Sequence, residues 1–285
     1  MNAVSPTGTQ PRAVLLLDAN ASAASRSAMA LRDMRETAQL WRLCWTLAVL
    51  DIRQRYRGSI LGPFWLTLST ALMVVSMGIV YSVLFGLHLR EYMPYLALSL
   101  VLWAFLGTLT VEACGTYTAA EGMIRAMRLP YTLHAVRIVL RNIMVLGHNV
   151  VVIVLVDLAL WSWPGWTALL AIPALLIWVV DALAVTLLLG ALCARFRDIP
   201  PIVASVMQMA FFLSAVIWKP AQLGKHEWMM SFNPFFTILE VVRGPLLGEV
   251  PSLWVYVSAL GYTALMAVGA WVLFVRARGR LAFWV

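Results

Sequence analysis

A stretch without a single formal charge, Phe64–Phe85, directly follows a segment that carries three arginines. The hydrocarbon core of a bilayer is about 30 Å thick, so a helix that crosses it needs about 20 apolar residues. The arginines are Arg53, Arg55 and Arg57, and basic residues beside a span stay on the cytoplasmic side. The junction therefore predicts a first membrane-spanning helix that leaves the cytoplasm near residue 64.

Composition extends this prediction to the whole chain. Of its 285 residues, 62% are hydrophobic and 12% are charged, whereas soluble domains average about 45–50% and 25%. The net charge of +8 also fits a nucleic-acid-binding protein, but its distribution follows membrane topology, so no nucleic acid partner is expected. The three cysteines show no ligand spacing, and no metal site is predicted. We predict an all-α, polytopic membrane protein.

Six segments have the length and apolarity of spanning helices. The fifth is short and carries Gln208, so it is the least typical of them. With six spans, 17 of the 21 basic residues fall on one side of the membrane and 4 on the other. The positive-inside rule then places both chain ends in the cytoplasm. The predicted spans are Phe64–Leu87, Pro94–Gly115, Ile143–Trp161, Thr167–Cys193, Ile202–Trp218 and Leu253–Val275.

The chain before the first span divides into two parts. Residues 1–30 are rich in Ala, Ser and Thr and poor in aromatics, which predicts a disordered extension. Residues 31–57 carry leucines at three- and four-residue steps, together with Trp41 and Trp45. This pattern predicts an amphipathic helix that lies in the membrane interface. The remainder, residues 58–285, is predicted to form one membrane domain.

The connection between the fifth and sixth spans, about residues 219–252, is apolar but interrupted. It contains WMMSFNPFFTILEVV, in which Asn233 and Pro234 break a continuous helix, and Arg243 follows directly. Non-helical backbone at membrane depth is tolerated only against protein or a water-filled cavity. We expect a pair of re-entrant helices on the outer side of the membrane. The alternative is a hairpin of amphipathic helices on the surface.

Motifs for catalysis are missing from the sequence. It contains no Walker A motif, no complete zincin motif and no G-x-S-x-G nucleophile elbow. We therefore expect neither an ATP site nor enzymatic activity in this chain. Polar residues inside the predicted spans are candidate functional groups, because charge at mid-bilayer is costly. They would form a proton relay in a secondary transporter or, alternatively, make hydrogen bonds between helices or line a cavity. These residues are Glu112, His148, Asn149, Asp157 and Asp181.

Four blocks of sequence carry a resemblance to a known family. They are RYRGSILGPFW (55–65), GMIRAMRLP (122–130), ARFRDI with FFLSAVIWKP (194–199 and 211–220) and NPFFTILEVVRGPLLG (233–248). In this order they resemble the permease subunits of ABC transporters that export polysaccharides, and most of all the O-antigen exporters. The resemblance extends from about residue 35 to the end of the chain.

The resemblance implies a homodimeric permease in the bacterial inner membrane, with two copies of a separate subunit that binds ATP and Mg²⁺. The implied cargo is a glycan linked to an undecaprenyl diphosphate carrier, and membrane lipids are further expected partners. By the same analogy, the loop at 122–137 would be a coupling helix seated on the ATPase. Its expected contacts are Glu121, Arg125, Arg128 and Pro130.

The family's pore is lined chiefly by the first and fifth spans, so the resemblance makes aromatic residues there candidates for the lining. They are Tyr81, Phe85, Phe211, Phe212 and Trp218. The arginines at 53, 55 and 57 would guide the anionic diphosphate of the carrier at the inner face. Alternatively, they act only as topology determinants.

Three alternatives stay open. Permeases for capsule or teichoic acid are close neighbours within the same class. A lipid-linked sugar transferase would need acidic or metal-binding residues clustered at one face, which the scattered carboxylates do not supply. A proton-coupled carrier would show inverted repeats or paired broken helices, whereas this sequence has one interrupted segment; Asp181 would be its first candidate group.

Overall fold

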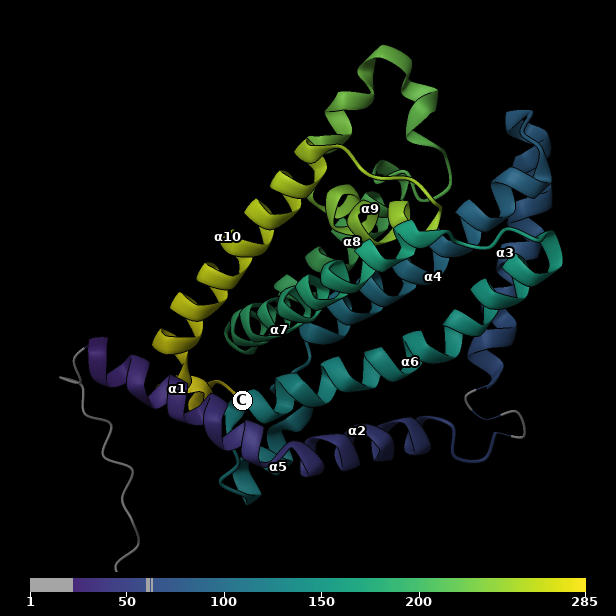
Figure 1. Cartoon of the computed structure of the whole chain (residues 1–285). Helices are drawn as coiled ribbons and strands as arrows, with labels where there is room; N and C mark the ends of the chain where they lie inside the picture. Colours follow the sequence, from purple (N-terminus) through teal and green to yellow (C-terminus); the bar gives the residue numbers. More distant parts are fainter. Residues whose placement is uncertain (1–22, 60–61, 63) are drawn as a thin grey trace, which may run out of the picture.

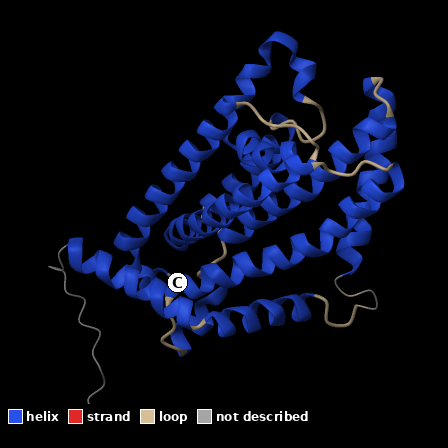
Figure 2. Cartoon of the chain, viewed as in Figure 1, coloured by secondary structure: helices blue, strands red, loops and turns tan. Residues whose placement is uncertain are grey.

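The computed structural model describes residues 23–59, 62 and 64–285, and all regular structure in these residues is helical (Figure 2). The prediction of an all-α fold is confirmed. The α-helices are α1 (Ala23–Gln39), α2 (Trp41–Arg55), α3 (Phe64–Phe85), α4 (Leu89–Ala113), α5 (Glu121–Ala126), α6 (Tyr131–Leu160), α7 (Ala171–Arg195), α8 (Ile199–Leu213), α9 (Pro234–Leu246), α10 (Leu253–Ala277) and α11 (Leu281–Trp284). Short 3-10 helices are η1 (Thr118–Ala120), η2 (Trp166–Leu170), η3 (Pro220–Phe232) and η4 (Arg278–Arg280).

Five helical segments of the described chain are long and apolar enough to cross a membrane. They are α3, α4, α6, η2 with α7, and α10 through α11. The predicted fifth span, Ile202–Trp218, overlaps α8, which has only 15 residues and ends at Leu213. Such a helix is about 22 Å long, against a hydrocarbon core of about 30 Å. Five candidate spans are therefore established, while a sixth span and the orientation of the chain stay predictions.

The backbone after α8 explains why this helix ends early. Ser214, Ala215, Val216 and Ile217 are buried, and Ala215 has a positive φ of 50°. Instead of continuing the helix, the carbonyls of this turn accept hydrogen bonds from side chains of the bundle. Tyr92 on α4 donates to the carbonyl of Ile217 at 2.5 Å. Irregular backbone is tolerated at membrane depth when protein satisfies it in this way.

Helix α4 forms the centre of the molecule. Every residue from Tyr92 to Trp103 is buried, as expected for a helix that is apolar on all sides. Helices α3, α6, α7, α8 and α9 pack around it, and α10 packs against α7 (Figure 1). Helix α3 joins the bundle through a narrow stripe of small residues: Thr67, Val74, Gly78 and Ser82. Small residues let helices approach closely in membranes, and the remaining apolar face of α3 is exposed.

Helix α6 begins at Tyr131, 12 residues before the predicted third span, which starts at Ile143. In the sequence, the charged residues of its first turns resemble those of a polar loop. In the structure they pair with residues of other helices, so this segment belongs to the helical bundle. The predicted coupling loop at 122–137 is therefore shorter in the structure. Residues 131–137 belong to α6, and α5 with residues 127–130 forms the connection.

The segment before the first span differs from its prediction in two ways. Residues 23–30 were expected to be disordered but form the start of α1, while residues 1–22 lie outside the described part. The single helix expected over 31–57 is two helices separated at Leu40. Both lie along the lower edge of the bundle in Figure 1, and α2 packs along α6. Its Trp41 and Trp45 are exposed, and their position in a membrane interface stays a prediction.

The interruption predicted within residues 219–252 is confirmed, because η3 ends at Phe232 and α9 begins at Pro234. Asn233 caps α9 with its side-chain oxygen, which accepts hydrogen bonds from the backbone N–H groups of Phe235 and Phe236. Helix α9 packs against α7 and α10, whereas η3 rises to the top of Figure 1. The re-entrant character of the pair stays a prediction.

Candidate functional site at the Arg-rich end

Basic side chains gather at one end of the molecule, here called the Arg-rich end, which comprises α1, α2, α5, the first turns of α6 and residues 276–285. Contacts between segments far apart in sequence hold this end together. Arg278 pairs with Asp33 of α1 at 3.0 Å, and Arg125 of α5 donates to the backbone oxygen of Val285 at 2.8 Å. The Arg-rich end thus brings together basic residues from three of the four segments that the positive-inside count had assigned to one side.

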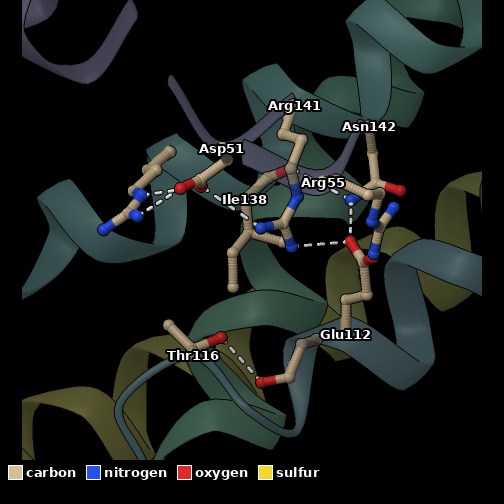
Figure 3. A network of polar contacts seen from close by, with 9 residues as sticks. Asp51, Arg55, Glu112, Thr116, Ile138, Arg141 and Asn142 are labelled. Carbon is tan, nitrogen blue, oxygen red and sulfur yellow. Dashed lines mark hydrogen bonds and ion pairs between the residues drawn. The ribbon is translucent and has the colours of Figure 1, made fainter. Parts of the chain in front are cut away.

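An ion-pair network at this end connects three helices (Figure 3). Asp51 of α2 accepts hydrogen bonds from Arg137 Nε at 2.8 Å and from Arg141 Nη1 at 3.2 Å. Glu112, in the last turn of α4, accepts from Arg141 Nη2 at 2.7 Å and from Arg55 Nη2 at 2.6 Å. Arg141 therefore bridges the two carboxylates and ties α6 to both α2 and α4.

The spacing of the charges in each helix makes this network possible. Asp51 and Arg55 are four residues apart on α2, as are Arg137 and Arg141 on α6, so each pair lies on one helix face. Asp51 and Glu112 side chains are only 9% and 15% exposed. Carboxylates this deeply placed need charged partners. Asn142 Nδ2 adds a further hydrogen bond to Glu112 at 2.8 Å.

The network separates the three arginines that the sequence analysis had grouped. The hydrogen bond to Glu112 raises the pKa of Arg55 above its usual value, so this guanidinium stays charged and engaged. Arg53 and Arg57 are exposed, and their side chains have no ion pair with any residue that the structure describes. Of the three predicted diphosphate-binding residues, Arg53 and Arg57 thus have no ion-pair partner among the described residues, whereas Arg55, whose side chain is 47% exposed, is paired with Glu112.

A buried carboxylate that the sequence analysis missed holds the start of α6. Asp33 of α1 accepts hydrogen bonds from the backbone N–H groups of Tyr131 at 3.2 Å and Thr132 at 2.9 Å. It thereby caps α6 from another helix, where a helix N-terminus has unpaired N–H groups. Thr37 also reaches the Thr132 hydroxyl at 2.5 Å. No local sequence signal identifies this cap, because Asp33 is 98 residues from the N–H it binds.

The predicted coupling residues lie next to this cap. Helix α5 projects below the bundle in Figure 1, and Arg125 pairs there with Glu121 at 2.8 Å. Both side chains are largely exposed, as is Arg128. Pro130 is buried and immediately precedes α6, where it fixes the direction of the chain. The segment thus presents a short, exposed, charged helix on a firmly anchored base.

The five candidate pore aromatics form two groups in the single chain. Tyr81 stacks on Phe85 with ring centroids 5.6 Å apart. Phe211 lies 5.1 Å from Phe212, and Trp218 donates from Nε1 to the Phe212 carbonyl at 2.9 Å. Phe212 is 58% exposed, whereas the other four are partly buried. The structure does not bring the two groups together, and their role as a pore lining stays a prediction.

The remaining polar candidates are dispersed. Asp181 of α7 accepts a hydrogen bond from Thr263 of α10 at 3.1 Å, which joins two helices. Asp157 accepts one from Ser162 at 3.0 Å. The His148 ring contacts the carbonyl of Met144 in its own helix. Among the described residues, no three His, Cys, Asp or Glu side chains come together as ligands for a metal ion.

The fold and this end of the chain define a polytopic α-helical membrane protein whose ion pairs between helices gather at the Arg-rich end. Comparison with known proteins gives the family. The sequence profile described as "ABC-2 type transporter" matches residues 42–247. The chain belongs to this family of membrane permeases, whose members work with an ATPase subunit.

Curated relatives agree with the resemblance noted in the sequence. The chain is 24% identical over 216 residues to the O-antigen export system permease protein RfbA of Myxococcus xanthus, which covers 73% of this chain and 82% of the relative. Two RfbA permeases of the same description from Klebsiella pneumoniae are each 20% identical, over 222 and 241 residues. These alignments cover 76% and 82% of this chain, and 84% and 91% of the relatives.

Proposed function

We propose that the chain is the membrane-spanning subunit of an ATP-driven exporter of O-antigen polysaccharide. The glycan would cross the bacterial inner membrane on its undecaprenyl diphosphate carrier and reach the periplasmic leaflet. The observation that carries this proposal is the likeness to O-antigen export permeases, which extends over most of both chains. The sequence contains no Walker A motif, which supports the proposal that a separate subunit hydrolyses ATP.

The proposed exporter contains two copies of this chain and two ATPase subunits. Helix α5 is the proposed contact with the ATPase, because it is short, exposed and charged. Its base is anchored by the α6 cap at Asp33 and by the bond from Arg125 to Val285. Because its base is anchored, a movement of α5 driven by the ATPase subunit is transmitted to α6. The ion-pair network then couples that movement to α2 and α4.

The Arg-rich end is proposed to face the cytoplasm, in accord with the positive-inside rule. Arg53 and Arg57 would then lie at the inner membrane surface, where they attract the diphosphate of the carrier. The pore would form between two copies of the chain, with the Tyr81 and Phe211 groups as its proposed lining. In this arrangement α8 is the proposed short fifth span, and η3 with α9 is the re-entrant pair.

The experiment for this proposal is co-purification of the tagged chain from its native membrane, followed by an ATPase assay. A variant with alanine at Glu121, Arg125 and Arg128 tests the α5 contact. A matched control carries alanine at Arg32 and Glu36, an exposed ion pair on α1. We expect the wild type and the control to retain an ATPase subunit, and the α5 variant to lose it or its stimulation.

Two results would count against the proposal. If the wild type purifies alone and without ATPase activity, the exporter assignment fails. If an ATPase subunit is present but the cells export a capsule or teichoic acid in place of O-antigen, the transporter class stands and the proposed cargo is wrong. Loss of the ATPase from the control variant would show that exposed charges elsewhere matter equally, and would remove α5 as the specific contact.

A further inference from the structure

A large cavity lies at the end of the molecule opposite the Arg-rich end. Its volume is 1010 Å³, which exceeds the range of about 300–1,000 Å³ typical of pockets for drug-sized ligands. Four segments enclose it: the start of α4, the connection between α6 and α7, η3 with α9, and residues 246–252. The cavity thus has room for several rings of an extended ligand.

Three exposed tryptophans line this cavity. Trp161, Trp163 and Trp228 are 73%, 56% and 63% exposed. They come from two separate segments, the α6–α7 connection and η3, so their meeting at one cavity is a property of the fold. Trp161 ends α6 with a left-handed backbone, φ 57° and ψ 41°, where glycine or asparagine is usual. The large ring is therefore displayed at the cavity although the backbone disfavours it there.

The charge of the cavity is acidic. Its lining contains five carboxylates and two basic side chains. Both basic groups are already engaged, since Arg90 Nε donates to the Leu160 carbonyl at 3.2 Å and the Lys219 ammonium lies 5.7 Å from the centroid of the Tyr95 ring. Three carboxylates of this lining have no ion pair or side-chain hydrogen bond with any described residue: Glu91, Glu227 and Glu249.

This combination selects one chemical class of ligand. Ionised carboxylates only accept hydrogen bonds, so they favour a ligand with many hydroxyl donors and repel phosphate. Tryptophan rings supply flat apolar surfaces with large contact area, against which the C–H faces of sugar rings can stack. A metal ion is a poor alternative, since no three acidic or other ligating side chains of the described residues come together as a metal site requires.

We propose that this cavity binds a neutral stretch of the glycan as it leaves the membrane. The inference rests on the proposed function and adds a second binding site to it, at the exit end of each chain. The two ends then have opposite tasks. Arg53 and Arg57 attract the diphosphate, while the acidic, tryptophan-lined cavity holds sugar and rejects the phosphate. Binding at the exit opposes backward sliding of the emerging polymer.

Site-specific photo-cross-linking in exporting cells tests this inference. A p-benzoylphenylalanine side chain is placed at position 163, 228 or 166. Position 166 is the matched control, because Trp166 is 89% exposed in the same connection but does not line the cavity. After illumination, we expect a ladder of protein–glycan adducts, stained by antiserum against the O-antigen, from positions 163 and 228 and not from 166.

A second measurement uses substitutions. The double variant Trp163→Ala with Trp228→Ala removes two stacking surfaces. We expect both the amount of glycan at the cell surface and the yield of glycan cross-linking at position 161 to fall about tenfold. Trp166→Ala should leave both readouts at the wild-type level. Glu227→Gln with Glu249→Gln should weaken cross-linking to the neutral glycan and allow the anionic carrier headgroup to be captured.

The outcomes separate the two proposals. If positions 163 and 228 yield no glycan adduct while the wild type exports glycan and retains its ATPase, the exit site is wrong and the exporter assignment stands. Adducts that contain only lipid, or equal adducts from position 166, also overturn the exit site. If the wild type neither exports glycan nor retains an ATPase subunit, the proposed function fails, and the exit site falls with it.

Discussion

Arg141 and Arg243 both lie beside the apolar core, at opposite ends of the molecule, but their surroundings differ. Arg243 is fully buried, and its carboxylate partner Glu240 is three residues earlier in the same helix. Its other hydrogen bonds go to Ser99 at 2.8 Å and to the carbonyl of Ala215 at 2.7 Å. Arg141 keeps 19% of its side chain exposed and bridges carboxylates from two other helices.

This difference determines whether each ion pair is sensitive to movements of helices relative to one another. A pair within α9 stays intact however α9 moves, so Arg243 acts by satisfying buried backbone and by filling space. The Arg141 network depends on the relative positions of α2, α4 and α6, because each contributes charges. Its partial hydration also lowers the cost of breaking and remaking bonds. Arg243 is therefore a fixed structural element, and the network around Arg141 is an adjustable one.

The largest expected effect is at Arg243. The substitution Arg243→Met leaves Glu240 without its cation and the Ala215 carbonyl without its guanidinium donor. Breaking a buried pair in this way costs about 3–5 kcal/mol, and we expect that loss in the free energy of unfolding, measured in detergent. The double variant Arg243→Met with Glu240→Gln should recover part of it.

Lys225→Met is the control for Arg243, since Lys225 is an exposed basic residue at the same end. Its unfolding free energy should equal that of the wild type. A wild-type stability for Arg243→Met would mean that the bundle does not depend on the buried guanidinium, and the contrast between the two arginines would disappear.

A smaller loss is expected in the network at the other end. Glu112→Ala removes the acceptor of Arg55, Arg141 and Asn142. Hydrogen bonds to charged groups contribute about 1.5–3 kcal/mol, but Arg141 keeps Asp51 and Arg55 can turn to water. We expect a loss of about 2–3 kcal/mol. A double-mutant cycle with Arg141→Ala should give a coupling energy of about 1–2 kcal/mol.

The cycle decides whether the network is shared. Additive effects of Glu112→Ala and Arg141→Ala would show that the two residues act independently. The ion pair between α4 and α6 would then contribute nothing to the free energy of unfolding. A pair with no shared contact, Glu112 and Arg278, supplies the reference cycle, in which we expect additivity.

The apolar pattern predicted the helices more reliably than it predicted their ends. Helices α3 and α10 begin at Phe64 and Leu253, the residues where the first and sixth spans were predicted to begin, because lipid and core both require apolar residues. The start of α6 could not be predicted in the same way, since Arg137 and Arg141 resemble a polar loop until their partner Asp51 is known. That partner is 86 and 90 residues away in sequence, and pairing at such distances leaves no local pattern.

The candidate site was predictable in composition and not in arrangement. The grouping of Arg53, Arg55 and Arg57 is visible in the sequence, but only the fold shows that Arg55 pairs with Glu112 and that the other two have no ion pair with any described residue. Likewise, the break at Asn233 was predictable from local chemistry, because Asn before Pro caps a helix. The burial of Arg243 was not, since its neutral acceptors come from α4 and from the turn after α8.

A moderate effect is expected at the cap of α6. Asp33→Ala removes the acceptor for the N–H groups of Tyr131 and Thr132, together with the partner of Arg278. Loss of a helix cap costs about 0.5–2 kcal/mol, and Arg278 can remain hydrated. We expect a loss of about 1–2 kcal/mol in stability and faster amide hydrogen exchange at residues 131–134. Asp33→Asn should retain part of the cap, and equal exchange in all three proteins would refute the assignment.

The smallest effect is expected for an ion pair that has the same chemistry but lacks burial. Arg32 and Glu36 of α1 lie 2.7 Å apart, and their side chains are 80% and 43% exposed. Such i,i+4 pairs contribute about 0.3–0.5 kcal/mol, and salt screens them. Arg32→Ala should therefore change the unfolding free energy by less than about 0.5 kcal/mol, and 1 M salt should abolish the change. A loss comparable to that of Glu112→Ala would show that exposed charges at the Arg-rich end stabilise the fold as strongly as bridged ones. Burial would then no longer explain why Arg243 and Arg141 differ.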